Sequence, residues 1–136
     1  MARPKPAGYP KELKTIGDHI RAWRIDNYLL QADIAKMLSV CEDTIVGWET
    51  RGIMPTIRQM PRIIKLMGYL PVDLDTSNLG CKITLYRYLH GLTPKEFGTL
   101  IPAHGSAVRD WEKGKYFPSR KKWFKVASII NTLPTH

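Results

Sequence analysis

The chain has 136 residues, and its 21 Lys and Arg against 12 Asp and Glu give a formal net charge of +9. This length accommodates one ordinary domain or two very small ones. With 43% hydrophobic and 24% charged residues the composition argues against a disordered or fibrous chain, and the excess of positive charge favours a polyanionic partner, nucleic acid or an anionic membrane.

Residues 1–14 form a basic, proline-rich N-terminal arm. The arm lacks the apolar stretch of a signal peptide, and no apolar run in the chain approaches the roughly 18 residues of a membrane span, so we expect a cytoplasmic protein. Arms that carry residues such as Arg3 and Lys5 can enter a DNA minor groove. An untethered terminus is an equally good interpretation.

After the arm, the chain repeats itself. Displacing it by 63 positions aligns seven identical residues, and apolar residues such as Ile45 and Val108 coincide as well. Identity together with matched apolar periodicity indicates two copies of one all-helical unit. The identical pairs are Gly17/Gly80, Ile20/Ile83, Arg24/Arg87, Leu29/Leu92, Trp48/Trp111, Glu49/Glu112 and Pro55/Pro118.

The first copy, residues 15–69, is predicted to form short helices that share a core. Thr15 opens a capping box and starts a helix over 16–26. A helix over 31–38 and a short helix around Trp48, whose side chain faces inward, follow.

The last segment of the first copy opens at Pro55. Thr56 is expected to cap it, and Pro61 is expected to divide it into two helices, because an interior proline removes a hydrogen bond and clashes with the preceding turn. The second copy has Phe124 at the position of Pro61. Its last segment, capped by Ser119, is therefore expected to run unbroken.

The second copy covers residues 78–131. Ser77 or Asn78 is expected to cap its first helix, which ends at His90, and Thr93 to cap the second. No segment of the chain shows the alternation with period two that is typical of a strand. The fold class is therefore predicted to be all-α.

Residues 70–77 are predicted to be a linker and residues 132–136 a C-terminal tail. The two copies differ in charge, because residues 1–70 carry 11 basic and 7 acidic side chains and residues 80–136 carry 10 basic and 3 acidic ones. The second copy therefore suits a polyanion better.

Residues that metal sites and active sites require are not found in the necessary spacing. Cys41 and Cys81 form no CxxC or Cys/His pattern, and each is expected to be a small buried or half-buried residue. The four histidines show neither metal-site nor triad spacing, so we expect no enzyme, no cofactor and no metal. Residues 73–77 resemble a calcium loop but lack its Gly and Glu. Membrane binding is not expected, because the apolar faces are needed for two small cores.

Residues 29–49 resemble the helix-turn-helix signature of the Cro and phage-repressor (XRE-type) family. Gln31 lies where the family has a phosphate-contacting Gln, Ala35 where it has a small residue between two helices, and Trp48-Glu49 where it has a Trp-Glu pair. The second copy resembles the family more weakly, with Gly98 at the small position and a proline in place of the Gln. The resemblance implies two tandem lambda-repressor-like helix-turn-helix bundles of four to five helices each.

The resemblance also implies two structural ion pairs, one in each copy. In the family an Arg late in the first helix pairs with the Glu that ends the third, which corresponds to Arg24 with Glu49 and to Arg87 with Glu112. Breaking a partly buried pair from one side is destabilising, because the surviving charge is left without a partner.

Carried over to this sequence, the family pattern assigns base-facing and phosphate-facing residues in each copy. Two of the base-facing residues of the first copy are acidic, whereas the second copy offers Arg109 for bidentate recognition of guanine. A solvated helix start is an equally good interpretation of the basic run at residues 120–122. The base-facing residues are Glu42, Asp43, Thr44, Val46, Gly47, Ser106, Arg109 and Asp110, and the phosphate-facing residues are Gln31, Arg51, Arg58, Thr93, His104, Lys113, Lys115, Arg120 and Lys121.

Two functions follow as expectations. The first is a sequence-specific regulator of transcription, such as a bacterial or phage repressor, which binds double-stranded DNA with both copies and is nucleoid-associated when bound. The second is an antitoxin-like or adaptor protein, in which the first copy contacts another copy of the chain, as in a homodimer, or a different protein, while the second copy alone binds nucleic acid.

Overall fold

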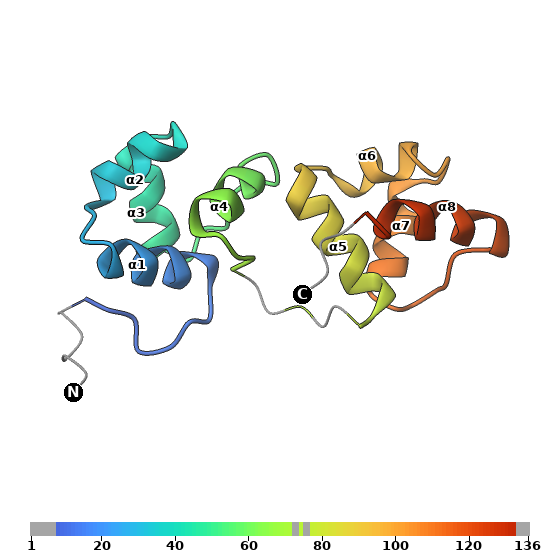
Figure 1. The fold of residues 1–136 in the computed structure, drawn as a ribbon, viewed down its shortest axis with the longest axis horizontal. Coiled ribbons are helices and arrows are strands. Elements are labelled where there is room, and N and C mark those ends of the chain that lie inside the picture. Colours follow the sequence, from blue (N-terminus) through green and yellow to red (C-terminus); the bar gives the residue numbers. More distant parts are fainter. Residues whose placement is uncertain (1–7, 72–73, 75–76, 133–136) are drawn as a thin grey trace. The chain divides into compact units, whose positions relative to one another are not determined.

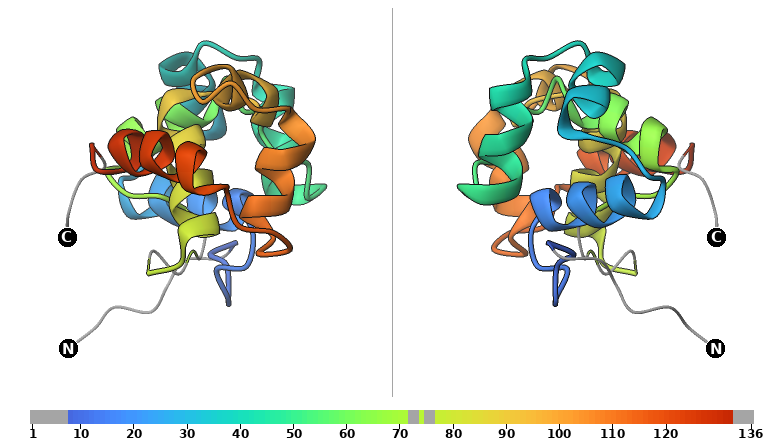
Figure 2. Two further views of the ribbon diagram at one scale, coloured as in Figure 1. Left: turned by 90° about the vertical axis from the view of Figure 1, so that its right-hand side faces the viewer. Right: turned by 90° about the vertical axis from the view of Figure 1, so that its left-hand side faces the viewer.

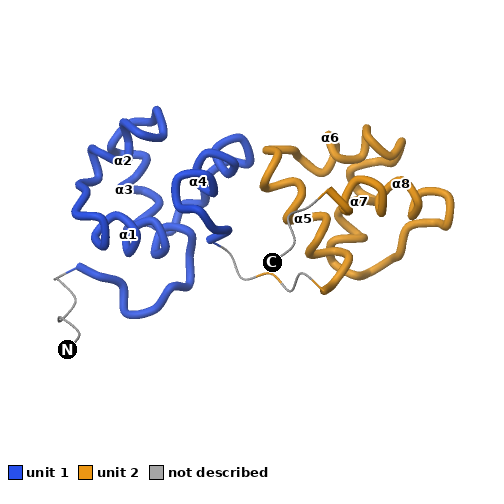
Figure 3. The backbone as a smooth tube through the Cα atoms, in the orientation of Figure 1, with its two compact units in different colours: residues 1–73 blue, residues 74–136 orange. Residues whose placement is uncertain are grey.

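The computed structural model describes residues 8–71, 74 and 77–132. Within these residues the secondary structure consists of eight α-helices without a strand, which confirms the all-α fold class (Figure 1; Figure 2). The chain divides into two compact units, unit 1 (Met1–Asp73) and unit 2 (Leu74–His136) (Figure 3). None of the described helices combines the length and apolar character that crossing a bilayer requires.

In the described residues, each unit contains four helices. The first three helices of unit 2 begin 63 residues after their counterparts in unit 1, at the displacement of the sequence repeat. The helices are α1 (Ile16–Asp26), α2 (Gln31–Leu38), α3 (Glu42–Thr50) and α4 (Met60–Met67) in unit 1, and α5 (Leu79–His90), α6 (Pro94–Thr99), α7 (Gly105–Glu112) and α8 (Arg120–Ile130) in unit 2.

Side-chain caps explain where four of the described helices begin. Thr15 and Asp18 form the predicted capping box of α1, and the side chain of Asn78 accepts hydrogen bonds at the start of α5. Thr93 caps α6, and Ser119 caps α8, which runs unbroken as expected. These caps satisfy backbone N–H groups that have no partner within the helix.

The last segment of unit 1 differs from the prediction. Thr56 does not cap a helix, because residues 57–59 form a turn and α4 begins only at Met60. Pro61 does not divide the segment either. It is the second residue of α4, where a missing N–H costs no hydrogen bond and the fixed backbone angle of proline suits a helix start.

The two units have matching cores. Seven pairs of buried residues in which both members are aliphatic, aromatic or Met are related by the displacement of 63, so the units bury the same positions even where the residue differs. These pairs are Ile20/Ile83, Ile34/Phe97, Leu38/Ile101, Ile45/Val108, Trp48/Trp111, Ile63/Val126 and Met67/Ile130.

Glycines allow the closest helix crossings. A Cβ added to Gly17 in α1 would lie 1.7 Å from the carbonyl oxygen of Trp48, and one added to Gly80 in α5 would lie 2.4 Å from that of Glu112. The first helix of each unit therefore crosses the end of the third helix at backbone contact, which no larger residue permits.

Candidate nucleic-acid interface

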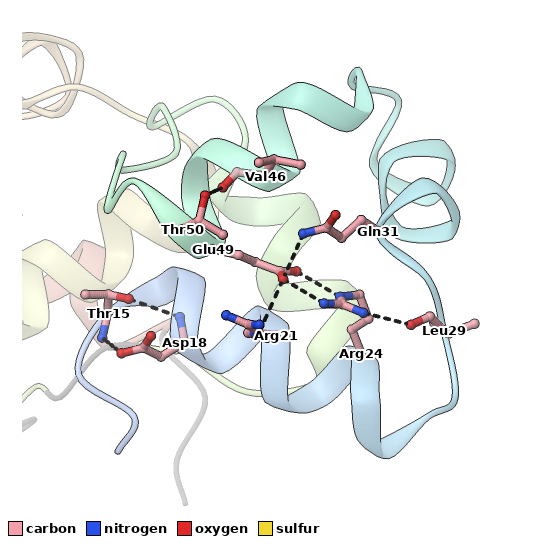
Figure 4. Close-up of polar contacts among 9 residues, drawn as sticks. All are labelled: Thr15, Asp18, Arg21, Arg24, Leu29, Gln31, Val46, Glu49 and Thr50. Carbon is pink, nitrogen blue, oxygen red and sulfur yellow. Dashed lines mark hydrogen bonds and ion pairs between the residues drawn. The ribbon is translucent and has the colours of Figure 1, made fainter. Parts of the chain in front are cut away.

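A buried ion pair anchors the third helix of each unit. In unit 1, Arg24 donates from Nε and Nη2 to the two carboxylate oxygens of Glu49, at 2.9 and 2.8 Å (Figure 4). Arg87 and Glu112 form the same two bonds in unit 2, at 2.8 and 2.7 Å. All four side chains are almost fully covered, with at most 13% of any of them exposed.

Each of these arginines makes one further bond. Nη1 of Arg24 donates to the carbonyl oxygen of Leu29, and Nη1 of Arg87 to that of Leu92. The guanidinium thus ties together the first helix, the turn that follows it and the end of the third helix. This contact fixes the orientation of the helix pair α2–α3 or α6–α7, which carries the predicted reading surface.

The surroundings of the two pairs differ at two repeat positions, Arg21/Thr84 and Gln31/Pro94. In unit 1, Arg21 places a second cation near Glu49, with its Nε 4.0 Å from Oε1, and this buried Nε makes no hydrogen bond (Figure 4). In unit 2 the same position holds Thr84, whose hydroxyl donates to Oε1 of Glu112. Each carboxylate thus accepts three hydrogen bonds, the third of which comes from Gln31 for Glu49 and from Thr84 for Glu112.

The outer face of α3 is acidic where the helix begins. Glu42 and Asp43 are exposed, and 83% of the Asp43 side chain is in contact with solvent. Arg51 follows the end of α3 and folds back along the helix, so that its Nη2 lies 3.4 Å from a carboxylate oxygen of Asp43. Because both side chains are solvated, this ion pair adds little stability. It does, however, turn Arg51, which was predicted to contact phosphate, toward the carboxylate of Asp43.

Gly47, which was predicted to face bases, is buried. A Cβ added there would lie 2.9 Å from Nη2 of Arg51 and 3.1 Å from Cδ1 of Ile53. The chain turns back at Gly52, and the backbone N–H groups of Arg51 and Ile53 both donate to the carbonyl oxygen of Gly47. The segment after the helix therefore covers this position.

Thr44 and Val46 are half-buried on α3. The hydroxyl of Thr44 lies 3.5 Å from Sγ of Cys41, which occupies the N-cap position of the helix. Cys41 is exposed, so the expectation of a buried or half-buried residue is wrong for it, because an N-cap lies at the helix surface. Cys81 is half-buried as expected.

The corresponding face of unit 2 is basic and concave. Ser106 and Arg109 are exposed on α7, whereas Asp110 is half-buried. Ser106 and Arg109 border a shallow pocket of about 450 Å³, and no lining residue is acidic. The remaining lining residues are Lys95, Thr99, Ala103, His104 and Gly105.

Lys95 and Thr99 were not among the predicted contact residues. A Cβ added to Gly105 would lie 3.1 Å from Cα of Lys95, so the first turns of α6 and α7 are in contact. This contact places Lys95 beside the predicted base-facing residues of α7. The repeat could have pointed to Lys95, because unit 1 has the uncharged Ala32 at the same position and unit 2 gains a positive charge there.

The predicted phosphate ligands of unit 2 lie at helix ends and in the segment that joins α7 to α8. Thr93 and His104 are the N-cap residues of α6 and α7, and the Thr93 hydroxyl accepts a hydrogen bond from the backbone of its own helix. Four exposed cations follow. They are Lys113 at the C-cap of α7, Lys115 in the joining segment, and Arg120 and Lys121 in the first turn of α8.

In unit 1, the predicted phosphate ligands besides Arg51 are Gln31 and Arg58. Nε2 of Gln31 donates to Glu49 at 3.2 Å, which uses one of its two N–H groups inside the unit (Figure 4). Arg58 is exposed in the turn before α4. Residues 1–7 of the N-terminal arm lie outside the described residues, and beyond them the hydroxyl of Tyr9 donates to Asp26 at 3.1 Å.

Among the described residues, no group of three or more His, Cys, Asp or Glu is arranged to hold a metal ion. The segment 73–77, which resembles a calcium loop, lies partly outside them. Comparison of the chain with protein-family models, with curated proteins and with solved structures gave no match.

Proposed function

We propose that this protein binds double-stranded DNA sequence-specifically and regulates transcription, with unit 2 as the main DNA-binding unit and α7 as the helix that enters the major groove. The observation that carries the proposal is the pocket between α6 and α7, which Lys95 and Arg109 both line without a carboxylate among the lining residues. An exposed helix of this kind fits a major groove.

The roles of the side chains follow from their positions. Arg109 projects from the exposed face of α7, where a guanidinium can donate two hydrogen bonds to a guanine edge. Lys95 and His104 border the same pocket at its helix starts and suit the flanking phosphates. Lys113, at the opposite end of α7, adds a charge that serves every sequence alike.

The acidic start of α3 favours a second candidate function for unit 1. Glu42 and Asp43 repel phosphates, and Arg51 is drawn toward Asp43. In this alternative, unit 1 contacts a protein, either a second copy of the chain or another partner, and unit 2 alone binds DNA.

Selection of bound sequences from a random duplex pool at about 150 mM salt, followed by footprinting of the selected site, tests both functions. Two half-sites about ten base pairs apart would mean that both units read DNA. One short site would mean that only unit 2 does. Absence of any enriched sequence would contradict the proposal.

A further inference from the structure

A second surface of unit 2, distinct from the pocket at α7, combines exposed aromatic rings with lysines. It lies on the segment that links the orange α7 to the red α8 in Figure 2 and on the first turns of α8. Tyr116, Phe117 and Phe124 are 61, 70 and 63% exposed. Large aromatic side chains are seldom left this exposed in a group without a binding role.

Two contacts involve rings of this surface, and helical spacing relates Phe124 to a lysine. The Phe117 ring lies against that of Trp123, with centroids 5.6 Å apart, and Nζ of Lys115 lies 5.5 Å from the centre of the Tyr116 ring. On α8, Phe124 follows Lys121 by three residues, a spacing that puts them on one face. Residues 113–130 contain six Lys or Arg and no Asp or Glu.

We propose that this surface, called here the aromatic-basic surface (Tyr116, Phe117, Phe124 and the lysines beside them), binds unpaired nucleotides of a single-stranded nucleic acid. Exposed rings give bases a face to stack on, and the lysines neutralise the backbone that connects the bases. Bases inside an intact duplex are already stacked on one another, so the surface favours single strands over duplex DNA.

The chemistry of the exposed residues favours nucleic acid over lipid. Apart from the three rings, Leu100 is the one large hydrophobic residue exposed in the described part of unit 2. A surface that inserts into a membrane would be expected to present more aliphatic side chains beside its cations. Three lysines also border a hollow of about 220 Å³ next to Ile101, at Lys121, Lys122 and Lys125, which suits a phosphate.

Unit 1 provides a matched control for this surface. At the positions of Tyr116 and Phe117 it carries Ile53 and Met54, which are similarly exposed, at 50 and 56%. The repeat therefore accommodates an aliphatic pair at this point, so the double variant Tyr116→Ile, Phe117→Met is expected to fold and to lose only the rings.

The test measures binding of the full chain to fluorescently labelled oligothymidine of about 20 nucleotides and to a duplex of the same length. The double variant is expected to weaken oligothymidine binding at least about tenfold, because each lost ring removes the binding free energy of one stacked base. Duplex binding is expected to change less than about twofold. The variant Tyr28→Ala, which removes an 89% exposed ring from unit 1, is expected to change neither.

Unchanged oligothymidine binding in the double variant would overturn the proposal, as would equal losses on both oligonucleotides. Sedimentation with vesicles of anionic lipid tests the other class of partner. Loss of vesicle binding without loss of oligothymidine binding would assign the surface to membranes instead. The proposal does not depend on α7 reading duplex DNA, because the selected duplex site and the oligothymidine are measured separately.

Discussion

Units 1 and 2 share a buried framework and differ on the surfaces that would meet a partner. The Arg24–Glu49 and Arg87–Glu112 pairs have the same bonds to within 0.2 Å. On the outer face of the third helix, by contrast, Asp43 corresponds to Ser106 and Val46 to Arg109. The interior of the repeat therefore constrains the fold, while exposed positions remain free to give each unit its own partner.

The units also differ in how tightly their helices approach. Unit 2 has Gly98 where unit 1 has Ala35, and a Cβ on Gly98 would lie 2.3 Å from the carbonyl oxygen of Ala103. It has Gly105 where unit 1 has Glu42, against the backbone of Lys95. Two missing side chains thus let α6 and α7 pack closely, which forms the basic pocket.

The largest expected effect comes from breaking the shared ion pair on one side. Glu112→Ala leaves the guanidinium of Arg87 buried without its carboxylate, so the free energy of unfolding of unit 2 should fall by about 3–5 kcal/mol. Urea unfolding followed by tryptophan fluorescence measures this loss. The control is Glu12→Ala, which removes the carboxylate of a surface ion pair. Because this side chain is 66% exposed, the midpoint of urea unfolding should not change. Equal curves for both variants would contradict the role of the buried pair.

Exchanging the small residues between the units tests the difference in helix approach. Gly98→Ala should destabilise unit 2 by about 1–3 kcal/mol, although alanine is the native residue of unit 1, because its Cβ would strike a backbone carbonyl. Ala35→Gly should cost unit 1 about 1 kcal/mol through helix propensity. Thermal unfolding of both variants measures this difference. Stabilisation by Gly98→Ala would show that α6 and α7 are not packed this closely.

A third prediction concerns the reading faces. Arg109→Ala should weaken binding to the selected duplex by about 1–3 kcal/mol and relax the preference at one base pair, because a bidentate base contact is lost. Lys113→Ala should weaken all duplexes alike and reduce the salt dependence by about one charge. Competition binding at several salt concentrations separates the two. Equal loss on specific and random duplexes in Arg109→Ala would remove Arg109 from base recognition.

A smaller effect is expected where the surroundings of the ion pairs differ. Arg21→Thr gives unit 1 the residue of unit 2 and removes the buried Nε that lacks a hydrogen bond, so unit 1 should become more stable by up to about 1 kcal/mol. The reciprocal Thr84→Arg should destabilise unit 2. Urea unfolding of the two variants measures both changes in the free energy of unfolding. Destabilisation by Arg21→Thr would contradict the prediction and mean that Arg21 stabilises the charge of Glu49.

The smallest expected effect is a pH dependence of unit 1 that comes from His19. Burial lowers the pKa of His19 from its usual 6.5, with Asp18 opposing, and Nδ1 of His19 lies 3.0 Å from the hydroxyl of Tyr69. Since the folded state disfavours the charged ring, its contribution to stability is present above pH 6.5 and declines as the pH falls below that value. The urea midpoint of unit 1 should fall slightly between pH 7.5 and 5.5. His19→Gln should reduce that fall, and an unchanged fall would exclude His19 as its source.

Features that depend on short-range patterns and on the repeat could be predicted from the amino-acid sequence alone. A capping box joins residues three apart, so Thr15 and Thr93 could be identified without knowing the tertiary structure. The buried positions follow helical periodicity. The family resemblance implied the contacts of Arg24 with Glu49 and of Arg87 with Glu112, and the recurrence of both partners together supported them.

How side chains and loops lie across helices depends on tertiary packing and could not be predicted from the sequence. Arg51 folds back over Gly47 and approaches Asp43, and Lys95 and Arg109 line one pocket from two helices. Neither arrangement has a local signature, because each depends on where the chain turns after a helix and how closely two helices pack. The physical reason is that caps and periodicity act within a few residues, whereas the composition of a surface is set by the packing beneath it.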